Sequence, residues 1–428
     1  MKFLYSDSLD FVDPEFDFIA DRGAKRRRAH ADDDFPHEHL ESAPYDGLLV
    51  SRAIVGDAKS TGKYSEAQAM RFRREGARAF LRYPLSRFPK SMVMGDNGAF
   101  TYRDKKDPPY TIDDTLDFYQ DGGFTHGCSI DHLIFDFLED GAKPSTDAKR
   151  RSQITLDFAR DFLPASRALG RGFTPVAVIQ GWSARSMADA AVSLASMGYK
   201  YLAVGGMVPL RIEQIEKALA TIREVLPKSV KLHLLGFGKT EHLLTVRKYG
   251  VASFDTTSPL LRAFKDGKRN YYSIGKNGDL LYYTAVRIPQ AIDNDKLTRN
   301  ARRGRLDQEN LIRLEARALE GVRKFAARRL KVESAVEAVI EYGRYALWDE
   351  RASEVRNEAR LAELRQAYIR TLGDRPWENC GCRVCRETGV EALIFRSSNR
   401  NKRRGIHNLH VFYAHLHSAK AATGIQSA

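Results

Sequence analysis

The chain has 428 residues, of which 43% are apolar and 29% charged, a composition typical of a globular protein and not of a disordered or collagen-like one. No run of eighteen apolar residues occurs and the N-terminus turns acidic at once, so we expect neither a membrane-spanning helix nor a secretion signal. Four cysteines are too few for a secreted disulfide scaffold, so we expect a cytoplasmic protein. The net charge of +14 favours a polyanionic partner, of which nucleic acid is the commonest.

Residues 1–45 are irregular, and their charges are segregated. A basic run at 25–28 is followed by an acidic run at 32–34. Blocks of like charge favour a mobile, solvated segment, so we expect an N-terminal arm over residues 1–45. The basic run is either a solvated loop or a phosphate-binding element, and a second basic segment at 400–404 is a candidate for the same role.

Residues 46–305 alternate between short β-rich runs and helical stretches such as 183–197 and 211–225. This alternation favours a parallel sheet and predicts an α/β protein with a (β/α)8 TIM barrel, the catalytic domain, over residues 46–305. A doubly wound open sheet is the alternative, but its usual glycine fingerprint is missing. The β-rich runs lie at 47–51, 91–95, 125–131, 175–180, 201–205, 231–235 and 252–255.

Residues 306–375 are predicted to be helical throughout. Apolar residues recur at helical spacing over 311–319, 336–347 and 358–371, and Gly373 and Pro376 end the pattern. We expect a helical insertion that packs against the barrel. A zinc-binding subdomain packed on the barrel is expected over residues 376–428.

Three of the four cysteines, Cys380, Cys382 and Cys385, fall within six residues. Three thiolates and an imidazole are the ligands of a closed, structural Zn²⁺ site. His407 follows as the fourth ligand, with three later histidines as competitors: His410, His415 and His417. The fourth cysteine, Cys128, lies in an apolar run and is expected in the core.

Two aspartates, Asp96 and Asp255, follow predicted strands. Acidic residues at the carboxyl ends of barrel strands face the catalytic mouth, where one carboxylate can act as a nucleophile and the other as an acid/base. The competing interpretation is that each is an N-cap of the next helix.

Polar and small groups end further strands. Asp131 supplies a carboxylate, Gln180 an amide, and Gly205-Gly206 exposed backbone N–H groups followed by the apolar Met207. Together these groups can read the edge of a purine-like base and cover its face, although each one alone is equally compatible with a structural role.

These motifs carry a resemblance to a known family. The segment 96–100 (Asp-Asn-Gly-Ala-Phe) resembles the Asp-Ser-Gly-Gly-Phe of the tRNA-guanine transglycosylases, which are zinc-containing (β/α)8 barrels that exchange guanine for a 7-deazaguanine base. The likeness covers roughly residues 90–285 and 378–413. Further matches are Gln180-Gly181, 204–207 (Val-Gly-Gly-Met), 234–238 (Leu-Leu-Gly-Phe-Gly), Phe254-Asp255 and 406–409 (Ile-His-Asn-Leu).

The resemblance implies a role for each candidate residue. It makes Asp255 the nucleophile and Asp96 the acid/base, and it selects His407 over His410 as the zinc ligand beside Cys380, Cys382 and Cys385. Base binding falls to Asp131, Gln180, Gly205, Gly206 and Met207.

Departures from the family pattern point to one of its branches. Asn97 and Ala99 replace serine and glycine, and the opening 1–14 and the long helical region resemble the DNA-modifying, DpdA-like branch. That branch inserts 7-cyano-7-deazaguanine (preQ0) into DNA beside an ATPase partner, which this chain cannot itself be because it has no P-loop motif. The alternatives are an enzyme acting on tRNA and a non-catalytic nucleic-acid-binding subunit of the same fold.

Overall fold

The computed structural model describes residues 1–422, which divide into two compact units. Unit 1 comprises Met1–Asp10 and Tyr45–Ser258, and unit 2 comprises Phe11–Pro44 and the chain from Pro259. No helix among the described residues has the length and apolar character needed to cross a lipid bilayer.

Unit 1 is a closed barrel of parallel strands, which confirms the predicted fold class. The strands pair in chain order, and the first closes the barrel against the last. Their bounds are β1 (Lys2–Ser6), β2 (Gly47–Ser51), β3 (Met92–Asp96), β4 (His126–Cys128), β5 (Thr174–Ile179), β6 (Tyr201–Val204), β7 (Lys231–Leu234) and β8 (Val251–Thr256).

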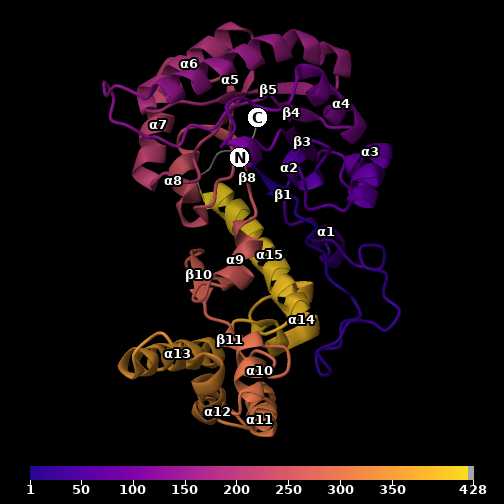
Figure 1. Ribbon diagram of the computed structural model, residues 1–428, viewed down its shortest axis with the longest axis vertical. Helices are drawn as coiled ribbons and strands as arrows, with labels where there is room; N and C mark the ends of the chain where they lie inside the picture. The colour runs from indigo at the N-terminus through magenta and orange to yellow at the C-terminus, as the bar shows by residue number, and fades with distance from the viewer. Residues whose placement is uncertain (423–428) are drawn as a thin grey trace. The chain divides into compact units, whose positions relative to one another are not determined.

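Helices between the strands surround the barrel (Figure 1). They begin at side-chain caps such as Ser183, whose hydroxyl accepts from the N–H of Ser186 at the start of α6. Their apolar faces are buried, as Ile215 and Leu219 of α7 illustrate. The helical elements are α2 (Arg52–Val55), α3 (Glu66–Phe80), η1 (Ala99–Tyr102), α4 (Ile112–Gly122), α5 (Thr146–Ala165), η2 (Ser166–Leu169), α6 (Ala184–Ser196), α7 (Ile212–Val225), η3 (Thr240–His242) and α8 (Leu243–Arg247).

The barrel interior changes from apolar to polar toward the carboxyl ends of the strands. Leu4, Leu49, Met94, Val178 and Ala203 belong to one buried apolar cluster inside the barrel. Because side chains two residues apart on a strand point to the same face, the next inward position on each strand lies at the mouth. Those positions carry Ser6, Ser51, Asp96, Gln180 and Gly205.

Unit 2 has a single core that joins its helices to the cysteine segment. Leu311, Val339, Tyr368, Cys385 and Ile406 belong to one buried cluster. The elements are α1 (Pro36–His39), α9 (Ser258–Lys265), the antiparallel pair β9 (Tyr271–Ile274) and β10 (Leu280–Tyr283), the parallel pair β11 (Val286–Arg287) and β12 (Ile394–Phe395), α10 (Asp295–Arg302), α11 (Gln308–Ala326), α12 (Val332–Ala346), α13 (Glu354–Asp374), α14 (Arg383–Thr388), η4 (Gly389–Leu393) and α15 (Ser398–Ala422).

The domain boundaries differ from those expected. The predicted arm 1–45 begins with a barrel strand, β1, and its remainder from Phe11 belongs to unit 2. The barrel unit ends at Ser258 and not at 305. The helical segment 306–375 and the zinc-binding segment share one core because the apolar faces of α11–α13 are buried against the cysteine segment. Residues 423–428 of the expected zinc-binding subdomain lie outside the described residues.

Candidate active site and metal centre

Asp255, on β8, is held by three groups at the barrel mouth. Ser6 Oγ donates to Asp255 Oδ2 at 2.6 Å. The backbone N–H of Gly236 donates to Oδ1 at 2.9 Å, and His233 Nε2 lies 3.2 Å from the same oxygen. The Asp255 side chain is 7% exposed. This side chain is therefore fixed in orientation and screened from bulk water.

Asp96 ends β3, and its two hydrogen-bond donors among residues 1–422 are both neutral. Ser51 Oγ donates to Asp96 Oδ1 at 2.7 Å, and the backbone N–H of Gly98 donates to the same oxygen at 2.6 Å. Burial raises the pKa of Asp96 to about 6 against the effect of these hydrogen bonds, and the negative charge of Asp255 adds to the rise. The Asp96 carboxyl can therefore take up and release a proton near neutral pH.

The two aspartates share one side of the rim. Strands β8, β1, β2 and β3 are consecutive in the barrel, so the Ser6–Asp255 and Ser51–Asp96 hydrogen bonds lie on adjacent strands. Asp96 is not an N-cap, since η1 begins after Gly98, and Asp255 lies inside β8. The competing interpretation of both residues as helix caps is therefore wrong.

Asp131 and Gln180 form a second polar group, at the ends of β4 and β5. Gln180 Nε2 donates to Asp131 Oδ2 at 2.7 Å, while Gln180 Oε1 accepts from the N–H of Ile134 at 3.3 Å. Burial raises the pKa of Asp131 to about 7 against the hydrogen bond from Gln180, and Asp96 adds to the rise. The amide thus orients the Asp131 carboxyl.

The glycines after β6 are required by this arrangement. A Cβ on Gly205 would lie 2.4 Å from Gln180 Nε2 and would displace the amide from Asp131. Gly206 has a φ of +70°, and a Cβ there would lie 3.1 Å from the carbonyl oxygen of Ile134. Met207 follows and is buried. The structure therefore brings the strand ends at 131, 180 and 205–206 together.

Sequence reasoning missed three residues that bind the two carboxyl groups: Ser6, Ser51 and His233. Ser6 falls within the segment predicted to be an irregular arm, but it stands two residues after Leu4 and so faces the barrel interior. The same spacing relates Ser51 to Leu49. His233 is fully buried, and its Nδ1 lies 2.6 Å from Ser253 Oγ, so its ring links β7 to two positions of β8.

Asn97, which replaces the family serine, has a structural role. Its Nδ2 donates to the carbonyl oxygen of Cys128 at 3.0 Å and to Tyr119 Oη at 3.2 Å. Thr115 Oγ1 donates to Asn97 Oδ1 at 3.1 Å. The amide thereby ties the β3–α4 connection to β4 and α4. Cys128 itself belongs to the barrel core, as expected.

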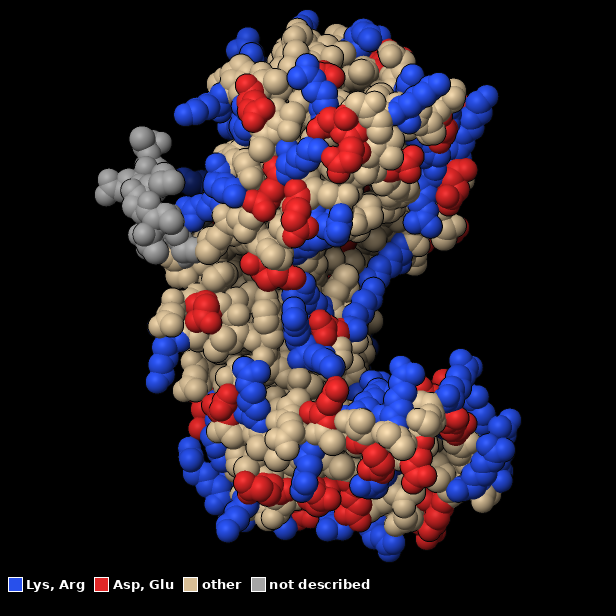
Figure 2. All heavy atoms as spheres, turned by 90° about the vertical axis from the view of Figure 1, so that its left-hand side faces the viewer, with Lys and Arg blue, Asp and Glu red and all other residues tan. Residues whose placement is uncertain are grey.

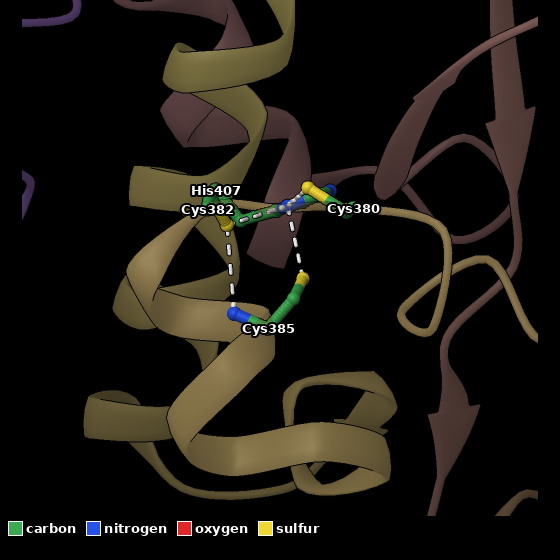
Figure 3. Close-up of side chains that lie close together, drawn as sticks. All are labelled: Cys380, Cys382, Cys385 and His407. Carbon is green, nitrogen blue, oxygen red and sulfur yellow. Dashed lines mark hydrogen bonds between the residues drawn. The ribbon is translucent and has the colours of Figure 1, made fainter.

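The predicted metal ligands meet in unit 2. Cys380, Cys382, Cys385 and His407 place their ligand atoms within 4.8 Å of one another. The side chains point toward one another, with Cys385 on α14 and His407 on α15 (Figure 3). The three sulfur atoms lie 3.3–3.5 Å from His407 Nδ1. This group could hold a metal ion.

The surroundings of His407 fit metal binding through Nδ1. His407 Nε2 lies 2.8 Å from the carbonyl oxygen of Tyr272, which fixes the proton on Nε2 and leaves Nδ1 free as a ligand. The Tyr271 ring stacks on the imidazole at 4.0 Å, and its hydroxyl lies 3.1 Å from Cys385 Sγ. Three thiols and one imidazole fill the four corners of a tetrahedral site and leave no open position, so a metal here would be structural.

The two basic segments differ sharply in exposure. At 25–28 the side chains are exposed, although Arg27 and Arg28 pair with Asp33 and Asp32. At 400–404 the arginines are buried: Arg400 is 1% exposed and Arg404 is fully buried. A phosphate-binding role for 400–404 is therefore wrong. On the face drawn in Figure 2, Lys and Arg side chains are interspersed with Asp and Glu.

No protein-family model matches the chain. A curated protein from Salmonella montevideo named DNA-guanine transglycosylase is 38% identical over 421 residues, which cover 97% of this chain and 96% of the relative. The chain belongs to the DNA-guanine transglycosylase family. The match runs through both units, which confirms the superfamily expected from the strand-end motifs.

Proposed function

We propose that this protein exchanges guanine in DNA for a 7-deazaguanine base, preQ0, through a covalent aspartyl intermediate. The single observation that carries the proposal is the pair of carboxyl groups on one side of the barrel rim. Asp255 is fixed by three contacts, whereas Asp96 has a pKa near 6. A fixed nucleophile and a group that exchanges protons near neutral pH are the two components that a double displacement needs.

In the proposed reaction an Asp255 oxygen attacks C1′ of the target deoxyguanosine. The glycosidic bond breaks, guanine leaves with its bonding electron pair, and a glycosyl ester remains on Asp255. Asp96 donates a proton to the leaving guanine. The incoming base then gives a proton back to Asp96 and attacks C1′, which releases the Asp255 carboxylate. One glycosidic bond replaces another, so no nucleotide cofactor is consumed. The guanosine must leave the helix, because C1′ is hidden within a duplex.

Base recognition is assigned to the other side of the rim. An ionised Asp131 accepts hydrogen bonds from the ring N–H and the exocyclic amino group of the purine. Gln180 keeps Asp131 in position, and the backbone at Gly205 and Gly206 approaches closely because neither residue has a Cβ. Met207 is proposed to cover the face of the bound base.

A Zn²⁺ ion held by Cys380, Cys382, Cys385 and His407 is part of the proposal and would stabilise unit 2. Elemental analysis of the purified protein should find one zinc per chain. Cys382→Ser should lose the metal and lower the melting temperature. A stoichiometric zinc content in His407→Ala together with its loss in His410→Ala would overturn the ligand assignment.

The proposal also includes DNA and an ATPase partner protein, and places the protein in the cytoplasm. The ATPase partner is implied by the resemblance to the DNA-modifying branch, and it is a separate protein because this chain carries no P-loop motif.

Nucleoside mass spectrometry of total DNA and of tRNA, from cells with and without the gene, tests the proposed function directly. The modified deoxynucleoside should appear in DNA only when the gene and its partner are present. A 7-deazaguanine that depends on the gene in tRNA and not in DNA would contradict the proposal.

A further inference from the structure

Two phenylalanines are exposed at the mouth of the barrel. Phe100 lies in η1 and is 47% exposed, and Phe135 lies in the β4–α5 connection and is 41% exposed. Their ring centroids are 6.1 Å apart with an interplanar angle of 50°. Both residues follow strands at their carboxyl ends, the face on which barrel enzymes bind their substrates. Two neighbouring exposed rings on this face form an apolar contact surface next to the substrate-binding end of the barrel.

Phe135 is placed next to the base-reading residues. The N–H of the preceding Ile134 donates to Gln180 Oε1, the amide that also contacts Asp131. A Cβ on Gly206 would touch the carbonyl oxygen of Ile134. The backbone immediately before Phe135 is therefore held by Gln180, while the Phe135 ring is exposed to solvent.

Hydrogen bonds join the β4–α5 connection, which contains Phe135, to the neighbouring β3–α4 connection. His132 Nε2 lies 3.0 and 3.2 Å from the carbonyl oxygens of Lys105 and Lys106, so Nε2 carries the proton. Arg151 donates to His132 Nδ1 at 2.9 Å, to the Arg103 carbonyl at 2.8 Å and to the Leu133 carbonyl at 3.0 Å. The β3–α4 and β4–α5 connections thus form one pre-organised surface.

This surface combines aromatic and cationic side chains. Arg103, Lys105 and Lys106 are exposed on the β3–α4 connection that His132 and Arg151 hold against the Phe135 segment. Arg103 pairs with Asp104 at 3.3 Å and Asp107 pairs with Arg150 at 2.8 Å, so Lys105 and Lys106 are the cations that this connection offers to a phosphate. Aromatic rings beside cations are the chemistry that binds unstacked nucleic acid: bases stack on the rings while the cations contact the phosphates. A peptide partner would offer neither a series of flat faces nor a regular anionic backbone.

We propose that Phe135 stacks against a DNA base that flanks the guanosine taken into the barrel. The inference rests on the proposed function and extends it from the target base to its neighbour. When the guanosine leaves the helix, the adjoining base loses a stacking partner, and the Phe135 ring supplies a replacement surface. Lys105 and Lys106 contact the phosphates of the same strand.

The test compares two single strands of equal length, one with ordinary bases and one with abasic residues at every position. Fluorescence anisotropy with the full-length protein gives the dissociation constant for each strand. Phe135→Ala should weaken binding to the base-bearing strand about tenfold, the range expected for loss of one base–aromatic stack, and should leave binding to the abasic strand unchanged. Phe135→Trp should restore the affinity.

Two control variants separate stacking from other effects. Leu85→Ala removes another exposed apolar side chain, 54% exposed, from the opposite end of the barrel and should change neither affinity. The double variant Lys105→Gln, Lys106→Gln should weaken binding to both strands alike, because phosphates are present in each. An equal effect of Phe135→Ala on the two strands, or no effect on either, would overturn the inference.

A merely structural role of Phe135 predicts a different result. If the ring only supported Ile134 and Gln180, Phe135→Ala would raise the KM for the free base. Stacking on DNA predicts an unchanged KM for the base and a higher KM for DNA. The binding measurement does not require turnover, so failure of the proposed base exchange and failure of this inference give distinguishable outcomes.

Discussion

Buried carboxyl groups occur in both units, but their partners differ. In unit 2, Asp21 lies between Arg396 at 2.6 Å and Arg400 at 2.7 Å. Burial acts to raise the pKa of Asp21, but the hydrogen bonds from these arginines outweigh it and lower the pKa. In the barrel mouth Asp96 and Asp131 have neutral partners, and burial raises both pKa values. A buried carboxylate paired with arginines is costly to remove once the fold is formed, whereas a buried carboxyl with neutral partners remains available for proton transfer and ligand binding.

The largest effect is expected from Asp255→Asn. The amide oxygen can still accept from the N–H of Gly236, and the amide NH2 can donate to the Ser6 hydroxyl, so the fold should persist, but an amide cannot form the glycosyl ester. Exchange of labelled guanine into DNA should be abolished, and no covalent protein–DNA adduct should appear on denaturing gels. An adduct formed by this variant would assign the nucleophile to another residue.

Asp96→Asn should reduce base exchange by about 10²–10⁴-fold, the usual cost of losing a general acid–base group. The nucleophile survives, so an adduct with sugar-labelled DNA should remain trappable. Ser51→Ala is the matched control: it removes one hydrogen bond to Asp96 but keeps the carboxyl group, so its loss of rate should be much smaller. Equal losses of rate in the two variants would show that Asp96 contributes through its hydrogen bond to Ser51 and not through proton transfer.

Asp21→Asn tests the structural role of the arginine-paired carboxylate in unit 2. The amide removes the negative charge that Arg396 and Arg400 share, while Arg396 keeps its ion pair with Glu315 and Arg400 keeps its ion pair with Glu391. The change should therefore cost about 1–3 kcal/mol of unfolding free energy. Denaturant unfolding measures the loss, and the rate per folded molecule should be unchanged. Normal stability with reduced turnover would contradict a structural role for this charge.

The smallest effect is a pH dependence of base binding. Since the pKa of Asp131 is about 7, the carboxylate that accepts from the purine is mostly protonated at pH 6 and mostly ionised at pH 8. The KM for the free base should therefore be about tenfold higher at pH 6 than at pH 8. Asp131→Asn should remove this dependence. A wild-type KM for the free base that rises with pH would contradict the assignment of Asp131 as ionised when it binds the base.

The same raised pKa values affect stability. A carboxyl whose pKa is higher in the folded than in the unfolded state stabilises the fold below its unfolded pKa, and this contribution is lost as pH rises through the folded value. For Asp96 and Asp131 the loss falls between about pH 4 and pH 7, a window set by the ordinary aspartate pKa and the raised values. Asp96→Asn should therefore flatten the pH dependence of unfolding in that window.

Much of the barrel could be predicted, because local patterns encode it. The runs at 47–51 and 201–205 are β-rich and end at turn residues, and the structure has strands there. The alternation of β-rich runs and helices did not reveal β1, because its five residues are followed by a long irregular stretch and not by a helix. Its pairing with β8 joins residues that are distant in sequence. The Cys380, Cys382, Cys385 and His407 group, which could hold a metal ion, was predictable because cysteines this dense have few other uses.

The sequence alone could not predict which basic segment is exposed to solvent. The basic segments at 25–28 and 400–404 look alike, but whether an arginine is solvated depends on acidic residues far along the chain. Arg400 pairs with Asp21, which lies 379 residues away. The hydroxyls that bind Asp96 and Asp255 were missed for the same reason, because pairing of strands distant in sequence brings Ser51 to Asp96 and Ser6 to Asp255.

Because β1 closes the barrel against β8, the barrel can close only late in synthesis of the chain. Ser6 and Asp255 are 249 residues apart, so the proposed nucleophile acquires its hydroxyl partner only after about three fifths of the chain has left the ribosome. Until then β1 and β7 each lack a neighbour on one side, and such open edges pair readily with other strands. We therefore expect truncations that remove the first six residues to aggregate during synthesis, whereas additions ahead of Met1 leave the strand intact.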